Sequence, residues 1–318
     1  MPPSGVGAIT VANDPSAQGI RFVPDPEAFF AQTERNEYTM LSFAAPGSGA
    51  TERKTIPQTG ILSKLTVLFV GTLDVTMGTG SIATCGAWPY GLLDAVTFDV
   101  NAQNALISVD GDDLYAHAQA KYPGFKAGDT GDTHPGTAGA GNAITADGDV
   151  VLTWEIPINV DDVTNVGAIY AQSPAMNLSL ALRRAVDTDL LAITGNSTWT
   201  LTGTFYIMGT VFDIPMVGDA NTKALIVPDV SRLHGLQAFS VPLTAVGENR
   251  APLIRHNAQL VRLFFQAVRS NPDASSTDQV LYLDDDLDDL DAVRIEYGAS
   301  NRPLDYNPGH LLRARNIK

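Results

Sequence analysis

A segment of the chain recurs 197 residues further on, and this repeat limits the possible folds more than any other feature. Residues 93–104 read LDAVTFDVNAQN and residues 290–301 read LDAVRIEYGASN, so six of the twelve positions are identical. At nearly the same offset, residues 65–69 (LTVLF) lie opposite residues 261–265 (VRLFF). The period of this repeat is too long for a solenoid, so the repeat predicts two copies of one domain. Chance similarity between strand-and-turn sequences is the alternative, and the uninterrupted Leu-Asp-Ala-Val identity favours duplication.

Most of the chain has the pattern of short strands. Residues 198–213 alternate apolar and polar side chains with the period of two that is typical of a half-buried strand. Residues 61–70 form a β-branched and apolar run, which predicts a buried strand. Further strands are predicted at residues 94–100, 149–158, 176–182, 236–243, 260–268 and 279–283.

Helices are predicted to be few and short. Residues 111–121 begin with Asp112 and Asp113, either of which would cap a helix, and residues 25–35 are a second short candidate. No longer stretch shows an apolar period of 3.6 residues. Gly and Pro are plentiful at 28 and 19 residues, whereas charged residues make up only 17%. The sequence therefore predicts a mostly β protein with many turns.

Stretches rich in Gly, Pro and polar residues divide the chain into three parts. Residues 1–50 are predicted to form an N-terminal arm, residues 51–216 the first β domain and residues 217–318 the second, because this length suits two domains. Residues 126–148, rich in Gly, Asp and Thr, are predicted to be a long loop that is either mobile or an exposed decoration. At the repeat offset the second domain has no counterpart of the strands between residues 149 and 215, so we expect it to be short or incomplete.

The acidic balance of the chain argues against direct binding of nucleic acid. There are 35 acidic side chains against 20 Lys and Arg, a net charge of −15, whereas neutralising phosphates requires basic side chains on the contact face. The single cysteine, Cys85, excludes an internal disulfide and has no neighbouring cation to activate it, so a small buried filler is expected. The N-terminus does not resemble a signal peptide, and the longest apolar run, residues 65–70, is too short to span a membrane. The chain is expected to be soluble.

Signatures of catalysis and cofactor binding are missing from the sequence. It contains no Gly-rich phosphate-binding loop, no Gly-x-Ser-x-Gly motif and no His-Glu-x-x-His pair, and no two of its five histidines have ligand spacing. We therefore expect neither an enzyme nor a cofactor. Glu155 beside Trp154, and Glu296 beside Tyr297, are the acids whose aromatic neighbours would suit a glycosidase, but adjacent side chains on a strand point to opposite faces.

Six carboxylates within eight residues near the end of the chain form the one candidate for a metal site. Asp284, Asp286 and Asp288 have the spacing that opens an EF-hand calcium loop. However, Asp289 stands where that loop needs Gly, and Ile295 stands where it needs Glu. A solvated acidic loop is the preferred interpretation, and the three aspartates are weak candidates for a structural Ca²⁺ site.

Five stretches, in their order along the chain, carry a likeness to a known family: residues 56–72, 154–158, 167–172, 203–215 and 293–303. With them the chain resembles the double jelly-roll major capsid proteins of tailless, membrane-containing icosahedral phages and related viruses, the tectivirus-like lineage. The resemblance covers roughly residues 50–318. It implies two tandem jelly-roll barrels in the chain, preceded by the arm.

The function that this resemblance implies is structural. Three chains would form a homotrimer whose six barrels make a pseudo-hexagonal capsomer, and capsomers would tile the shell of a virion assembled in the host cytoplasm. Neighbouring capsomers, penton and minor capsid proteins and an internal viral membrane are the implied partners. Phe22, Phe29 and Phe30 would either contact that membrane or pack against the base of a barrel.

The alternative function is a carbohydrate- or receptor-binding jelly-roll module of the kind found in spikes. Trp88, Trp154 and Trp199 would then supply stacking platforms for sugar rings, although single tryptophans in strands are more often part of a core. His134, in the Gly-rich loop, is interpreted as a solvated residue.

Overall fold

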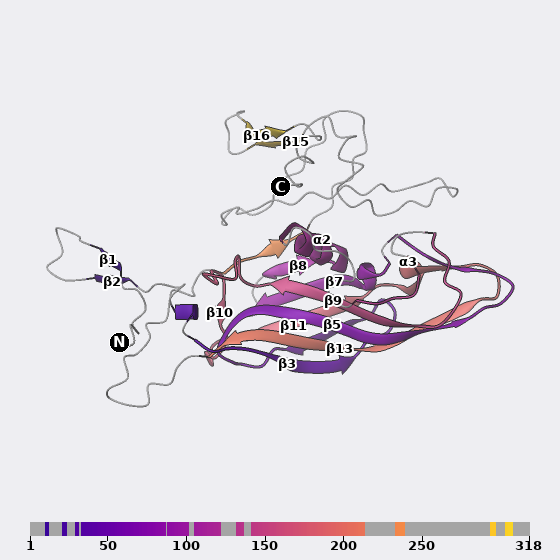
Figure 1. Ribbon diagram of the computed structural model, residues 1–318, viewed down its shortest axis with the longest axis horizontal. Coiled ribbons are helices and arrows are strands. Elements are labelled where there is room, and N and C mark those ends of the chain that lie inside the picture. Colours follow the sequence, from indigo (N-terminus) through magenta and orange to yellow (C-terminus); the bar gives the residue numbers. More distant parts are fainter. Residues whose placement is uncertain are drawn as a thin grey trace, which may run out of the picture.

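The computed structural model describes residues 10–12, 21–23, 29–31, 33–86, 88–101, 105–121, 132–136, 141–213, 233–238, 293–296 and 303–307. Most of these residues form one β barrel whose strands run along its long axis (Figure 1). Two separate antiparallel hairpins accompany it. One pairs β1 (Thr10–Ala12) with β2 (Arg21–Val23), and the other pairs β15 (Val293–Glu296) with β16 (Pro303–Asn307).

The first sheet of the barrel holds its longest strands. It has the order β9 (Gly148–Pro157), β5 (Ile61–Thr76), β13 (Thr198–Phe212) and β3 (Arg35–Ala44), all antiparallel. The short strand β10 (Ile169–Tyr170) pairs with the beginning of β5. The register shifts once between β13 and β5 and once between β13 and β3, and such bulges increase the local twist that closes a barrel.

The second sheet covers the other side of the core. Its antiparallel strands are β4 (Thr51–Thr55), β11 (Leu178–Arg184), β7 (Leu93–Val100) and β8 (Ile107–Val109), and β14 (Leu236–Gln237) adds to β8 in parallel. A small sheet pairs β6 (Ile82–Thr84) with β12 (Leu191–Ile193). The described helices are η1 (Tyr90–Leu92), α2 (Gly111–Lys121), the short α3 (Asp187–Leu190) and a turn at residues 29–31.

The order of strand pairing identifies the barrel as a jelly roll. Along the chain its eight principal strands are β3, β4, β5, β7, β8, β9, β11 and β13. The first pairs with the last, the second with the seventh, the third with the sixth and the fourth with the fifth. This nested pairing, split between two sheets, is the double Greek key of an eight-stranded jelly roll. The predicted mostly β, jelly-roll fold is confirmed for residues 35–212.

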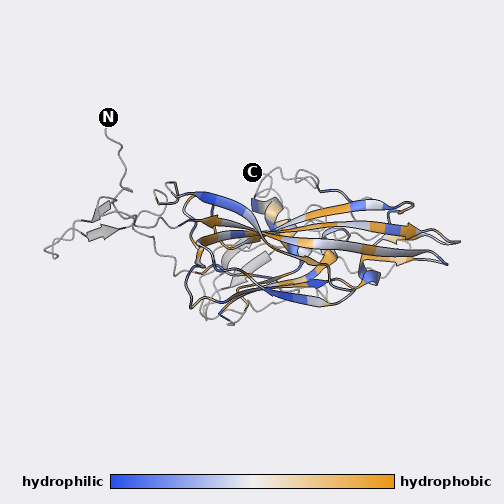
Figure 2. Ribbon diagram, turned by 90° about the horizontal axis from the view of Figure 1, so that it is seen from below, coloured by the Kyte–Doolittle hydropathy of each residue, from blue (hydrophilic) through white to orange (hydrophobic). Residues whose placement is uncertain are grey.

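The core fills the space between the two sheets. Leu65, Val67 and Phe69 alternate along β5 and are at most 1% exposed, as the period of a half-buried strand requires. They meet Phe205 of β13 and Phe98 of β7, which are fully buried. Figure 2 shows hydrophobic residues recurring along the long strands. Burying each such side chain contributes about 1.5–3 kcal/mol, so this core is the main source of the barrel's stability.

The barrel begins earlier than the sequence predicts. Residues 35–44, expected in the arm, form β3 and pair with β13 along the whole strand, so the predicted arm 1–50 is too long. The next strand, β4, was also absent from the expected strands. Both are edge strands whose side chains are only partly covered, so no apolar alternation marks them. Of the strand expected at 236–243, the structure describes residues 236–238, and Leu236–Gln237 pair with β8 of the first barrel.

The two copies of the sequence repeat form the same kind of hairpin. In the first copy, β7 and β8 are joined by residues 101–106, and in the second, β15 and β16 are joined by residues 297–302. Both connections are therefore six residues long, and both strand pairs are antiparallel. A one-residue register shift within β15–β16 is the main difference between them. The expected strands 260–268 and 279–283 lie outside the described residues.

Candidate functional site

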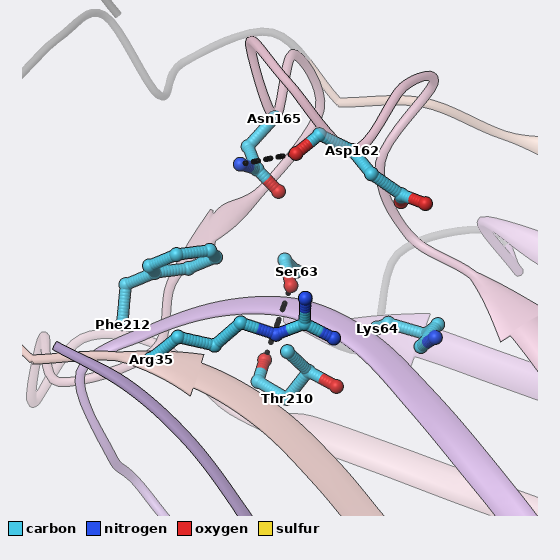
Figure 3. Close-up of a pocket in the computed structure, with 7 residues that line it drawn as sticks. All are labelled: Arg35, Ser63, Lys64, Asp162, Asn165, Thr210 and Phe212. Atoms are coloured by element: carbon cyan, nitrogen blue, oxygen red, sulfur yellow. Dashed lines mark hydrogen bonds between the residues drawn. The ribbon is translucent and has the colours of Figure 1, made fainter. Parts of the chain in front are cut away.

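A small pocket lies where β3, β5 and β13 meet the loop after β9 (Figure 3). The space between its walls and the adjoining solvent amounts to about 220 Å³, and within it there is room for about one water molecule. Its lining residues are Arg35, Ser63, Lys64, Asp162, Asn165, Thr210 and Phe212. The Ser63 hydroxyl donates to the Thr210 carbonyl at 3.3 Å, and the Asn165 amide donates to the Asp162 carbonyl at 3.4 Å. These polar groups are thus engaged in holding the fold.

An ion-pair network lies beside this pocket and shares Lys64 and Asp162 with its lining. Both Lys64 and Lys121 donate to Glu155, at 3.2 and 3.0 Å, and Lys121 also reaches Asp162 at 3.4 Å. The side chains of Lys64, Lys121 and Glu155 are less than 20% exposed, and with Asp162 the network joins two cations to two carboxylates. The sequence pattern alone did not predict this network, because its members are as much as 91 residues apart in the chain.

The cationic groups of the pocket have acidic partners on the barrel itself. Arg35 donates to Glu37 at 2.5 Å, and this hydrogen bond, with the charges of Arg35 and Lys64, lowers the pKa of Glu37 against the effect of burial. The Glu155 carboxylate lies between two ammonium groups, while Trp154 beside it is 1% exposed and faces the core. The predicted opposite orientation of these two residues is confirmed, and the arrangement is typical of a structural ion-pair network.

Three aspartates gather at the start of α2. The Asp110 carboxylate accepts from the backbone N–H of Asp113 at 2.7 Å, so Asp110 is the capping residue, not Asp112 or Asp113 as predicted. The helix begins at Gly111, which makes the preceding residue the cap. Burial and then the neighbouring Asp110 carboxylate raise the pKa of Asp113 to about 6. Burial also raises the pKa of Asp112 well above its ordinary value. The cluster makes the barrel's stability pH-dependent.

The tryptophans proposed as sugar platforms belong to the core. Trp88 and Trp154 are each 1% exposed, and Trp199 packs against the same core. The indole of Trp88 donates to the Pro135 carbonyl at 3.1 Å, and the ring of His134 meets it edge-on with centroids 6.1 Å apart. His134 is therefore partly covered by the Trp88 ring and partly exposed, not fully solvated as interpreted from the sequence.

The remaining candidates also have structural surroundings. Phe29 and Phe30 are buried against Ile61, Ala168 and Phe212, so they pack on the barrel, and this alternative to membrane contact is confirmed for both. Half-buried Cys85 points its thiol at the Thr188 carbonyl, and burial, then Asp189, raises its pKa, which disfavours a reactive thiolate.

The described part of the chain holds neither a metal-binding cluster nor a membrane-spanning helix. There, no cluster of three acidic, histidine or cysteine side chains could hold a metal ion. Likewise, none of the described helices combines the length and the hydropathy of a membrane span. Asp284, Asp286 and Asp288 lie outside the described residues, so the weak Ca²⁺ site stays a prediction.

Comparison with known proteins gives matches among solved structures alone. No protein-family model matches the chain, and no curated protein matches it. It is similar to the STIV major capsid protein at 17% identity and a TM-score of 0.42, covering 57% of this chain and 49% of that one. It is also similar to a structure of the Sulfolobus Turreted Icosahedral Virus, at 19% identity and a TM-score of 0.43, covering 57% of this chain and 46% of that one. The PBCV-1 virus capsid matches at 13% identity and a TM-score of 0.39, covering 57% of this chain and 43% of that one. The chain spans less than half the length of each of these proteins.

Proposed function

We propose that this chain is a structural coat protein, a non-enzymatic unit of an icosahedral virus shell. One observation carries the proposal: a complete jelly roll over residues 35–212 is followed by a second copy of its β7–β8 hairpin, at β15–β16. A strand pair that recurs with the same connection length supports a chain built from two related barrels. The function then belongs to the surfaces between chains.

Two similar barrels in one chain suit a particular assembly. Three such chains related by a threefold axis present six similar barrels, so a homotrimer has nearly sixfold edges and can tile a curved shell. Neighbouring capsomers are the partners this geometry requires. Penton and minor capsid proteins and an internal membrane are further proposed partners, with assembly of the virion in the host cytoplasm.

The described side chains also support a structural role. Lys64 and Lys121 pair with Glu155 and Asp162 in the charged network beside the pocket, so two cations meet two carboxylates. Trp88 and Trp154, which a sugar-binding module would need at its surface, fill the core. These features favour a coat protein over the carbohydrate- or receptor-binding module.

Light scattering on the purified full chain tests the proposal. A chain of 33.7 kDa should give a stable trimer of about 100 kDa. A glycan array run on the same preparation separates the two functions. A strict monomer that binds a glycan saturably would overturn the coat-protein assignment.

A further inference from the structure

The outer side of the first sheet carries a nearly chargeless area. Val70 of β5 lies opposite Thr204 of β13 and Val151 of β9, and the next row places Leu68 opposite Tyr206. With its neighbouring rows and β3, this area, here named the neutral face, has twelve positions. They are Thr39, Ser42, Ala44, Thr66, Leu68, Val70, Val151, Thr153, Glu155, Thr204, Tyr206 and Met208. None of the twelve is buried, and Val70 is 41% exposed.

The charge of this face differs from that of the whole chain. The chain carries a net charge of −15, yet Glu155, at a corner, is the only Asp, Glu, Lys or Arg among the twelve positions. Lys64 and Lys121 both pair with Glu155, and Lys121 also pairs with Asp162, so two cations meet two carboxylates at this corner. Charged residues begin only at the ends, with Glu37 and Lys64 in one adjoining row and Asp149 in the other. From strand and residue spacings, the face covers about 400 Å².

The outer side of the second sheet has a different character. Arg53 pairs with Asp99 at 2.6 Å, and Arg183 pairs with Asp94 at 3.1 Å. The side chains of Arg53 and Arg183 are 58% and 48% exposed, so water solvates both cations. A chargeless surface that covered this side would displace that water without offering the two guanidinium groups a replacement for it. This desolvation would cost free energy. The neutral face carries no such penalty.

We propose that the neutral face is a contact between two copies of this chain, each copy burying its own neutral face about a twofold axis. Two chains that each carry a net charge of −15 repel each other. When two neutral faces meet, no unbalanced charge on one copy lies against a like charge on the other. Meeting the second sheet instead would leave Arg53 and Arg183 facing a chargeless surface. The neutral face therefore matches itself better than it matches the other side.

The contact rests on the proposed function and adds a location to it. A threefold trimer is held by head-to-tail contacts, so a self-matching twofold contact joins one trimer to the next. About 400 Å² from each copy is half of what a standard stable interface buries. A single contact of this size is weak, so capsomers stay separate at low concentration. Many such contacts together can hold a lattice once capsomers are concentrated.

Charge substitutions test this contact. Val70→Glu places a carboxylate on an exposed position of β5, an inner strand of the face, and Thr97→Glu adds the same charge on the outer side of the second sheet. Sedimentation velocity over a concentration series measures trimers and larger species, and circular dichroism melts check the fold. We expect Val70→Glu to raise the concentration needed for larger species at least about tenfold, and Thr97→Glu to behave as the wild type. Ala44→Glu, on the exposed edge of the same face, replaces Val70→Glu if that variant does not fold.

The outcomes separate this inference from the proposed function. Wild-type trimers that never associate further, or Val70→Glu trimers that associate as readily as the wild type, overturn the neutral-face contact and leave the coat-protein proposal standing. A wild-type dimer that Val70→Glu abolishes, with no trimer at any concentration, supports the contact and overturns the trimeric coat protein.

Discussion

Gly71 and Gly203 lie opposite each other on β5 and β13, and the ring of Phe69 packs closely on both. A Cβ at position 203 would lie 2.5 Å from Cζ of Phe69 and 2.7 Å from the Val70 carbonyl oxygen. Phe69 has little room to move, because it is 1% exposed and its ring centroid is 5.1 Å from that of Phe205. The absence of a side chain at Gly203 is therefore a packing requirement.

Replacing Gly203 with alanine should lower the free energy of unfolding by about 1–2 kcal/mol. Overpacking a filled core costs about 1–3 kcal/mol. The reduced entropy of the unfolded chain, about 0.5–1 kcal/mol for replacing a glycine in a strand, offsets part of that cost. In a domain of this size the melting temperature should fall by about 2–8 °C, measured by calorimetry or circular dichroism.

A double-mutant cycle assigns the loss to the Phe69 ring. Phe69→Leu shortens the obstructing side chain, so combining it with Gly203→Ala should cost less than the sum of the two single variants. Gly47→Ala is the matched control, because a Cβ at position 47 meets nothing within 4 Å. A Gly203→Ala variant that melts at or above the wild-type temperature, or a cycle that is additive, would refute this packing argument.

Two further substitutions test the charged groups of the barrel. The folded pKa of Asp113, about 6, lies above its ordinary 3.8, so its contribution to stability is full below pH 4 and is lost as the pH rises through 6. Asp113→Asn should therefore raise the free energy of unfolding by about 1–2 kcal/mol at pH 7 and by little at pH 4, as measured by urea titration. This figure is smaller than the full pKa shift would give, because solvent screens the charge. An equal gain at both pH values would contradict this expectation. Lys121→Met should lower the free energy of unfolding by about 1–2 kcal/mol, because Glu155 loses one of its cationic partners. Adding Glu155→Gln to this variant should recover part of the loss, and no recovery would argue against the ion pair.

Some of this structure could be read from the sequence because local patterns determine it. The long strands β5 and β13 each have one face in the core, so their side chains alternate or run apolar over many residues. Helix α2 has an acidic first turn. The repeat at residues 93–104 and 290–301 predicted a recurring unit, and a strand hairpin occurs in both copies.

The candidate sites could be read only in part. The lack of a catalytic motif and the opposite orientations of Trp154 and Glu155 follow from residue types and strand period. The ion pairs of Glu155 with Lys64 and Lys121 do not, because they depend on which strands and helix lie side by side. Nor could the sequence tell that Trp88 is covered by the loop at Pro135.

The sequence by itself determined the mostly β composition, the long buried strands and the repeat, since each is written in the spacing of neighbouring residues. Tertiary structure decided that β3 belongs to the barrel and that the neutral face exists. β3 is an edge strand held by its pairing with β13, so no pattern of its own marks it. The neutral face requires the register of four strands whose residues lie far apart in the chain, and register is a property of the folded sheet.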